Sequence, residues 1–174
     1  MKKSKVLKMS LTALFTAMIF ILTRFVSVPV ALGYVHFGDA FVFIVASAFG
    51  GPYAVIAAVI GEALADVSYG MIYYVPATII IKLIMALLFV IVYKKSDKIL
   101  TPLTVGISVI CGVINVLGYF IADLIIDKSY AVINLLGNGI QGIGSVVIFI
   151  VVALAFDNGN IKKKLFLNGD IDNG

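Results

Sequence analysis

The chain has 174 residues, of which 62% are apolar and 13% are charged, with a formal net charge of +4 and a mean hydropathy of +1.15. A soluble domain is about half apolar and about one quarter charged, so a water-soluble fold could not bury this much apolar surface and a bilayer must be its solvent. A single cysteine, Cys111, and a single histidine exclude an internal disulfide and argue against a zinc cluster.

Six apolar segments follow one another along the chain and predict an all-α integral membrane protein, a bundle of six transmembrane helices. They lie at about 9–32, 40–50, 52–66, 75–93, 102–125 and 130–156. The second and third segments are short and meet at Gly50-Gly51-Pro52, a strong helix break. A helix of about eleven residues rises only ~16 Å, against a hydrocarbon core of ~30 Å. We therefore expect the second span to start early, to tilt, or to pack against protein rather than lipid.

The placement of lysine separates six spans from five. Basic residues cluster before the first segment, at 94–98 and at 162–164, and cytoplasmic loops are enriched in Lys and Arg. Six spans place all three clusters and both termini in the cytoplasm, whereas five spans would divide them. We therefore predict one membrane domain over 1–174, embedded at about 9–156, with a cytoplasmic tail at 157–174.

Strongly polar side chains gather in the outer halves of the predicted spans and in the first outer loop. In each helix they stand three or four residues apart, so they share a face. Buried charge is costly in a bilayer and usually faces a bundle interior or a wet cavity. The pattern predicts one pocket for a small polar molecule, open to the outside, and not a pore. The residues concerned are His36, Asp39, Glu62, Asp66, Lys82, Asn115, Tyr119, Asp123, Asn134, Asn138 and Gln141.

Structural interpretations of the same residues stay open. Glu62 and Lys82 could pair only with each other, and Asn138 and Gln141 could bond between helices without touching a ligand. Arg24 could extend to the outer interface. His36 stands in a predicted loop, and the sequence shows no partner for it.

Four groups of residues resemble a known family. They are Ala13-x-x-x-Ala17; Val35-His36-Phe37-Gly38-Asp39 before Gly50-Gly51-Pro52; Gly61-Glu62-Ala63-Leu64-Ala65-Asp66 followed by Tyr74-x-Pro76-Ala77-Thr78 and Lys82; and Gly137-Asn138-Gly139-Ile140-Gln141. Over about 5–157 the chain resembles the substrate-binding (S) component of an energy-coupling factor (ECF) vitamin transporter. The resemblance is to the riboflavin-type branch, which includes proteins assigned to hydroxymethylpyrimidine or pyridoxine-like substrates. The chain departs from the family in carrying Glu62 where a small residue is usual.

The resemblance implies a six-helix bundle in a bacterial plasma membrane that binds a B vitamin or precursor near its outer face. It also implies partners, namely a membrane coupling (T) subunit, on which Ala13 and Ala17 would dock, and a pair of ABC-type ATPases. Small residues four apart allow such close helix contact. The substrate contacts predicted from the pattern and the resemblance together are His36, Asp39, Glu62, Tyr74, Lys82, Asn115, Tyr119, Asn138 and Gln141.

Two other classes of function stay open from the residues alone. A self-sufficient, ion-coupled carrier could use Glu62, Asp66 and Lys82 as a proton relay, and a structural protein could use its polar residues only to join helices. The chain contains no GxxxxGK[ST], HExxH or GxSxG motif. We therefore expect no enzymatic activity, no cofactor and no metal, and energy for uphill transport must come from an ion gradient or from partner proteins.

Overall fold

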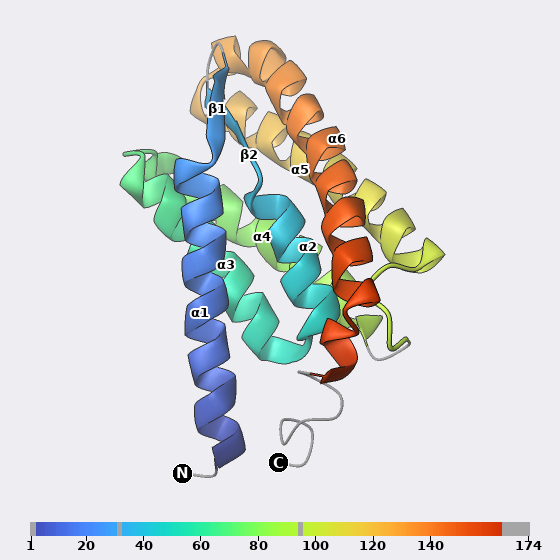
Figure 1. Ribbon diagram of the computed structural model, residues 1–174. Helices are drawn as coiled ribbons and strands as arrows, with labels where there is room; N and C mark the ends of the chain where they lie inside the picture. The colour runs from blue at the N-terminus through green and yellow to red at the C-terminus, as the bar shows by residue number, and fades with distance from the viewer. Residues whose placement is uncertain (1–2, 31–32, 94–95, 165–174) are drawn as a thin grey trace.

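The computed structural model describes residues 3–30, 33–93 and 96–164, and these form a bundle of six α-helices with one β-hairpin (Figure 1). The helix α1 begins and α6 ends at the same end of the bundle, at the bottom of Figure 1, and the hairpin lies at the opposite end. In chain order the elements are α1 (Lys3–Phe25), β1 (Ser27–Val30), β2 (Gly33–His36), α2 (Gly38–Ala48), α3 (Gly51–Ser68), the short 3-10 helix η1 (Ile72–Tyr74), α4 (Val75–Val90), α5 (Pro102–Ile126) and α6 (Lys128–Asn158).

Five of the described helices are long and apolar enough to cross a membrane, namely α1, α3, α4 together with η1, α5 and α6. The exception is α2, which has only 11 residues. Every residue of α2 except Phe41 is buried, and the helix packs against α1, α3, α4 and α6. The prediction that this short segment packs against protein is therefore confirmed. The fold is that of an all-α, multi-pass membrane protein.

The end of the first predicted span is wrong. Hydropathy extends it to about residue 32, but α1 ends at Phe25 and an antiparallel hairpin follows, in which Ser27 pairs with His36 and Val28 with Val35. Pro29 cannot continue a helix, and it disfavours helical backbone at the residue before it. Apolar β-branched residues score alike in a strand and in a helix, so hydropathy alone does not find this change.

The predicted break between the second and third segments is confirmed. Gly50 and Gly51 both have φ of 64°, a left-handed conformation that favours glycine, and Pro52 opens α3. A Cβ atom on Gly50 would lie 2.4 Å from the ring of Tyr93, so a larger residue would also displace that side chain.

The remaining helices lie close to their predicted positions. The segments predicted at 75–93, 102–125 and 130–156 correspond to α4, α5 and α6. The carboxylate of Asp157, in the last turn of α6, accepts the backbone N–H groups of Ile99 and Leu100 at 2.7 and 2.8 Å, which ties α6 to the connection before α5. Of the predicted polar tail at 157–174, residues 165–174 lie outside the described residues.

Three phenylalanine rings from α2, α4 and α6 form a buried layer across the bundle. Phe43 stacks on Phe89 with ring centroids 5.0 Å apart, and Phe149 lies edge-on to both at 5.9 and 5.5 Å. All three are fully buried. Phe43 lies one turn after Asp39 along α2, so this aromatic layer directly adjoins the polar residues at the start of that helix.

Candidate functional site

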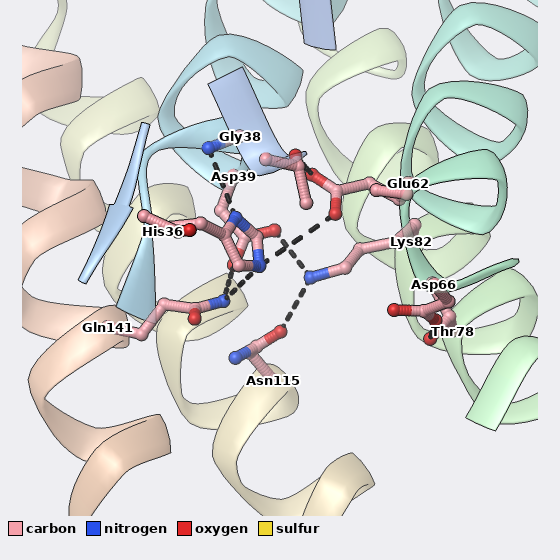
Figure 2. A network of polar contacts seen from close by, with 12 residues as sticks. His36, Gly38, Asp39, Glu62, Asp66, Thr78, Lys82, Asn115 and Gln141 are labelled. Atoms are coloured by element: carbon pink, nitrogen blue, oxygen red, sulfur yellow. Dashed lines mark hydrogen bonds and ion pairs between the residues drawn. The ribbon is translucent and has the colours of Figure 1, made fainter. Parts of the chain in front are cut away.

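One buried polar network lies inside the bundle beside the hairpin (Figure 2). Each of its principal side chains comes from a different element, and none is more than 5% exposed. They are His36 of β2, Asp39 of α2, Glu62 of α3, Lys82 of α4, Asn115 of α5 and Gln141 of α6. The structure thus brings together six of the nine side chains predicted to contact a substrate.

Lys82 lies at the centre of the network. Its ammonium group forms an ion pair with Asp39 and donates a hydrogen bond to Asn115 Oδ1 at 2.8 Å. The ring of Tyr119 lies 5.3 Å from Lys82 Nζ. Lys82 therefore pairs with Asp39, and the alternative in which it pairs only with Glu62 is not what the structure shows. A buried charge is tolerated when it is paired in this way.

His36 and Gln141 connect the hairpin to α6. Gln141 Nε2 donates to Asp39 Oδ2 at 2.7 Å and lies 3.0 Å from His36 Nε2. His36 Nδ1 accepts the backbone N–H of Gly38 at 3.1 Å. The histidine that has no evident partner in the sequence is thus a buried member of the network.

Glu62 completes the network from the side of α3. Thr23 Oγ1 donates to Glu62 Oε1 at 3.1 Å, and His36 Nε2 lies 3.9 Å from Glu62 Oε2. A Cβ atom on Gly38 would lie only 2.4 Å from Glu62 Oε1 and 1.9 Å from Thr23 Oγ1. Glycine at this position therefore lets the carboxylate approach the backbone at the start of α2, where the helix dipole favours negative charge.

A second polar cluster lies where α5 ends and α6 begins. The hydroxyl of Tyr74 donates to Asp123 Oδ1, and Asn134 Nδ2 donates to Asp123 Oδ2 at 3.1 Å. The rings of Tyr74 and Tyr119 are 6.2 Å apart. This contact joins Tyr74, one of the predicted site residues, to the aromatic surroundings of the central network.

Tyr119, Thr78 and Asp66 form a further set of hydrogen-bonded side chains. The oxygens of Tyr119 and Thr78 are 2.9 Å apart, and Thr78 also donates to Asp66 Oδ2. Thr78 precedes Lys82 by one helical turn and lies on the same face of α4. This spacing is the sequence signal that could have identified Thr78 as a neighbour of the site. Asn138 takes no part in these groups of hydrogen bonds; it is half-buried on α6, between Asn134 and Gln141.

Arg24 lies apart from the network. Its guanidinium group stacks on the ring of Tyr69 at 4.1 Å, and the Tyr69 hydroxyl donates to the Arg24 carbonyl at 2.7 Å. Tyr69 also contacts Ser27 Oγ at 2.7 Å, so it fixes the start of the hairpin against α3. Within the described part of the chain, no group of three His, Cys, Asp or Glu side chains is arranged to hold a metal ion.

A separate apolar groove of about 570 Å³ lies between α1 and α3. Its lining includes Ala13 and Ala17, the two small residues that stand four apart in α1. Thr12 and Thr16 line the same groove, and their hydroxyls donate back to the carbonyls of Lys8 and Thr12 at 2.8 Å. These hydroxyls are therefore already satisfied within α1, which leaves the groove suited to an apolar partner.

Comparison with known families gives one finding that bears on function. Residues 3–158 match the family described as ECF-type riboflavin transporter, S component. No curated protein matches the chain. The matched range includes the hairpin, all six helices and every residue of the polar network.

Proposed function

This chain belongs to the family of ECF-type riboflavin transporter S components, and we propose that it captures a B vitamin or vitamin precursor from outside the cell for ATP-driven uptake. An S component is the vitamin-binding subunit of such a transporter. The candidates are hydroxymethylpyrimidine, pyridoxine and riboflavin-like molecules, all of which are small and polar with an aromatic ring.

The observation that carries this proposal is the depth of the polar network. Six buried polar side chains from six elements meet beside the hairpin (Figure 2), and the aromatic layer begins one turn after Asp39 along α2. A continuous polar path through the bundle would suit a channel, whereas a polar cluster closed on one side suits a binding pocket. The ligand would replace some of the hydrogen bonds that these side chains now make with one another.

We assign substrate contacts to the predicted set of His36, Asp39, Glu62, Tyr74, Lys82, Asn115, Tyr119, Asn138 and Gln141. Six of these form the network itself. Tyr74 and Tyr119 would supply aromatic surfaces against a ligand ring. Asn138 stands about one turn before Gln141 on α6, so it would reach the ligand from the outer side.

The proposed orientation places both termini and the 94–98 connection in the cytoplasm of a bacterial cell, with the hairpin outside. Six crossings of a plasma membrane give this arrangement, and α2 would make its crossing inside the protein rather than against lipid. The lysine clusters support this orientation through the enrichment of basic residues in cytoplasmic loops. We further propose that Ala13 and Ala17 dock on the coupling (T) subunit, which works with a pair of ABC-type ATPases, and the groove beside them supports this.

The test is vitamin binding by the purified protein, followed by uptake. Native mass spectrometry and calorimetry with a panel of B vitamins and precursors should give one tight complex with one ligand per protein. Asn115→Ala should weaken that complex, whereas Lys98→Ala, a change of an exposed residue, should not. In liposomes, uptake should require ATP together with the coupling subunit and the ATPases. A panel without any bound member would refute the proposal.

A stand-alone ion-coupled carrier is the second candidate. The observation in its favour is the 3.9 Å approach of Glu62 to His36 beside Lys82, because such groups can pass protons. Uptake into liposomes driven by a pH gradient, with no other protein present, would support this carrier and exclude the S-component mechanism.

A further inference from the structure

We infer that the network selects a basic nitrogen heterocycle, bound with a positively charged or N–H-donating amino edge against Glu62. The inference rests on the proposed function, because it names the class of vitamin that the same site would take. It goes beyond that function by predicting a preference for amino-substituted rings over neutral ones and by assigning the preference to one residue.

The first argument is the balance of charge. The central network and the neighbouring Thr78–Asp66 pair together contain three buried carboxyl groups, Asp39, Glu62 and Asp66, and one buried ammonium group, Lys82. The ion pair with Asp39 already uses that ammonium group. Burial in a bilayer disfavours the ionised form of a carboxyl group that has no cationic partner, so a ligand that brings a positive charge or an N–H donor to Glu62 stabilises that form and binds more favourably here than a ligand without one.

The second argument is the capacity of Glu62 to accept hydrogen bonds. A carboxylate has about four acceptor positions. Glu62 receives one hydrogen bond, from Thr23 at 3.1 Å, and His36 Nε2 lies 3.9 Å from its other oxygen. Asp39, by contrast, is already bound on both oxygens, by Lys82 and by Gln141. Glu62 is therefore the carboxylate best able to accept an amino edge.

The third argument is independent of the carboxylates and comes from Asn115. This side chain is 0% exposed, and its Oδ1 accepts a hydrogen bond from Lys82 at 2.8 Å. Its Nδ2 has no hydrogen-bond partner among the described residues. Burying a donor without a partner is unfavourable, and an acceptor on the ligand would remove that cost. A well-matched ligand therefore has a hydrogen-bond donor that reaches Glu62 and an acceptor atom that reaches Asn115 Nδ2.

A heteroaromatic ring with an amino substituent satisfies both requirements. Its ring nitrogen or hydroxyl group can accept from Asn115 while its amino group donates to Glu62. The ring of Tyr119 lies beside Lys82. The ring of Tyr74 lies 6.2 Å from the ring of Tyr119, so an aromatic surface is available for stacking. A neutral ring system such as that of riboflavin would bring no positive charge to these carboxylates.

The experiment compares two pairs of ligands that differ at one substituent. The pairs are pyridoxamine with pyridoxine, and 4-amino-5-hydroxymethyl-2-methylpyrimidine with its 4-oxo analogue. Calorimetry on the detergent-purified full chain should show that the amino member of at least one pair binds about tenfold or more tightly than its partner, because hydrogen bonds to charged groups are the stronger ones. Glu62→Gln should reduce this preference to about twofold or less, mainly by weakening the amino member.

Two further variants separate recognition from folding. Glu62→Asp keeps the carboxylate and should retain most of the preference for the amino ligand. It therefore tests the role of the carboxylate if Glu62→Gln does not fold. Asp97→Asn removes an exposed carboxylate and should retain the preference in full. Thermal unfolding of each variant shows that the compared proteins are folded.

The outcomes distinguish this inference from the proposed function. Equal binding of both members of each pair, tight binding of riboflavin alone, or an equal loss for both members in Glu62→Gln would overturn the inference and leave vitamin capture standing. Failure of every vitamin and precursor to bind would overturn the proposed function itself.

Discussion

The polar network and the aromatic layer are two adjoining regions built by the same three helices. Each of α2, α4 and α6 gives one side chain to the network and, four to eight residues later, one phenylalanine to the layer, as the pairs Asp39 and Phe43, Lys82 and Phe89, Gln141 and Phe149. These spacings keep both residues of a pair near the same inward face. One face of each helix thus changes from polar to aromatic within about two turns.

The difference between the two regions indicates how a helix bundle in a membrane can bind a small molecule without forming a channel. The network is held by directed hydrogen bonds and one ion pair, whose partners a polar ligand can replace. The aromatic layer is held by packing, and it has no polar group with which to exchange. Under the proposed function, a ligand would enter the first region, while the second would close the bundle beside it.

The largest expected effect is that of Lys82→Met. Removing one member of a buried ion pair leaves the carboxylate of Asp39 uncompensated, which costs about 3–5 kcal/mol. The unfolding midpoint in detergent should fall, and vitamin binding should be lost. The double change Asp39→Asn with Lys82→Met should recover part of the stability, since it removes both charges. If the double variant were less stable than Lys82→Met, the pairing of these two residues would be wrong.

Phe89→Ala should have the next largest effect, but on stability alone. The cavity left between Phe43 and Phe149 should cost about 3 kcal/mol, near the lower end for such changes because the two remaining rings can partly collapse. Thermal unfolding should show the loss, while calorimetry should show the same order of preference among vitamins. A change in that order would mean that the aromatic layer belongs to the binding site.

Gly38→Ala should disturb the network at the point where α3 meets α2. The added Cβ would lie 1.9 Å from Thr23 Oγ1 and 2.4 Å from Glu62 Oε1, so these side chains must move, at a cost of about 1–3 kcal/mol. Gly106→Ala in α5 is the matched control, because no heavy atom lies within 4 Å of its added Cβ, and it should raise stability by up to about 1 kcal/mol. Equal unfolding midpoints for the two variants would contradict the packing described for Glu62.

Asp127→Ala should have the smallest effect, at the junction of α5 and α6, and the effect should depend on pH. The side chain and backbone N–H of Ser129 donate to Asp127 and hold the pKa of this exposed carboxyl below its usual value. A folded-state pKa that is lowered gives stability that is present above the unfolded-state pKa and is lost as pH falls through the folded-state value. Unfolding midpoints of the variant and the wild type should therefore differ at pH 7 and converge on acidification. A difference that grows at low pH would contradict this hydrogen-bonded cap.

Much of the site could be predicted because polar residues are rare in lipid. Lys82, Asn115 and Gln141 stand out in apolar helices, and burial in a bilayer leaves such residues few places except the bundle interior. Helical spacing then gives their shared face, and chain direction gives their common depth. The same reasoning predicted the buried position of α2, whose length is too short to span lipid by itself.

The hairpin and the partners of His36 could not be predicted in this way. Hydropathy rates the residues of β1 as a continuation of α1, although Pro29 ends any helix there. The contact of His36 with Gln141 joins residues 105 positions apart, and no local pattern contains it. Glu62 likewise looks like a partner for Lys82 in the sequence, whereas in the fold Asp39 takes that place.

The sequence by itself determined the solvent of this protein, the number and order of its helices, and the set of polar side chains that must turn inward. These follow from composition and helical periodicity, which act within short stretches of chain. The tertiary structure alone decided which carboxylate Lys82 pairs with, where the hairpin ends, and that Thr23 and Gly38 support Glu62. The physical reason is that pairing energies depend on distances between separate helices, and those distances exist only after the bundle has packed.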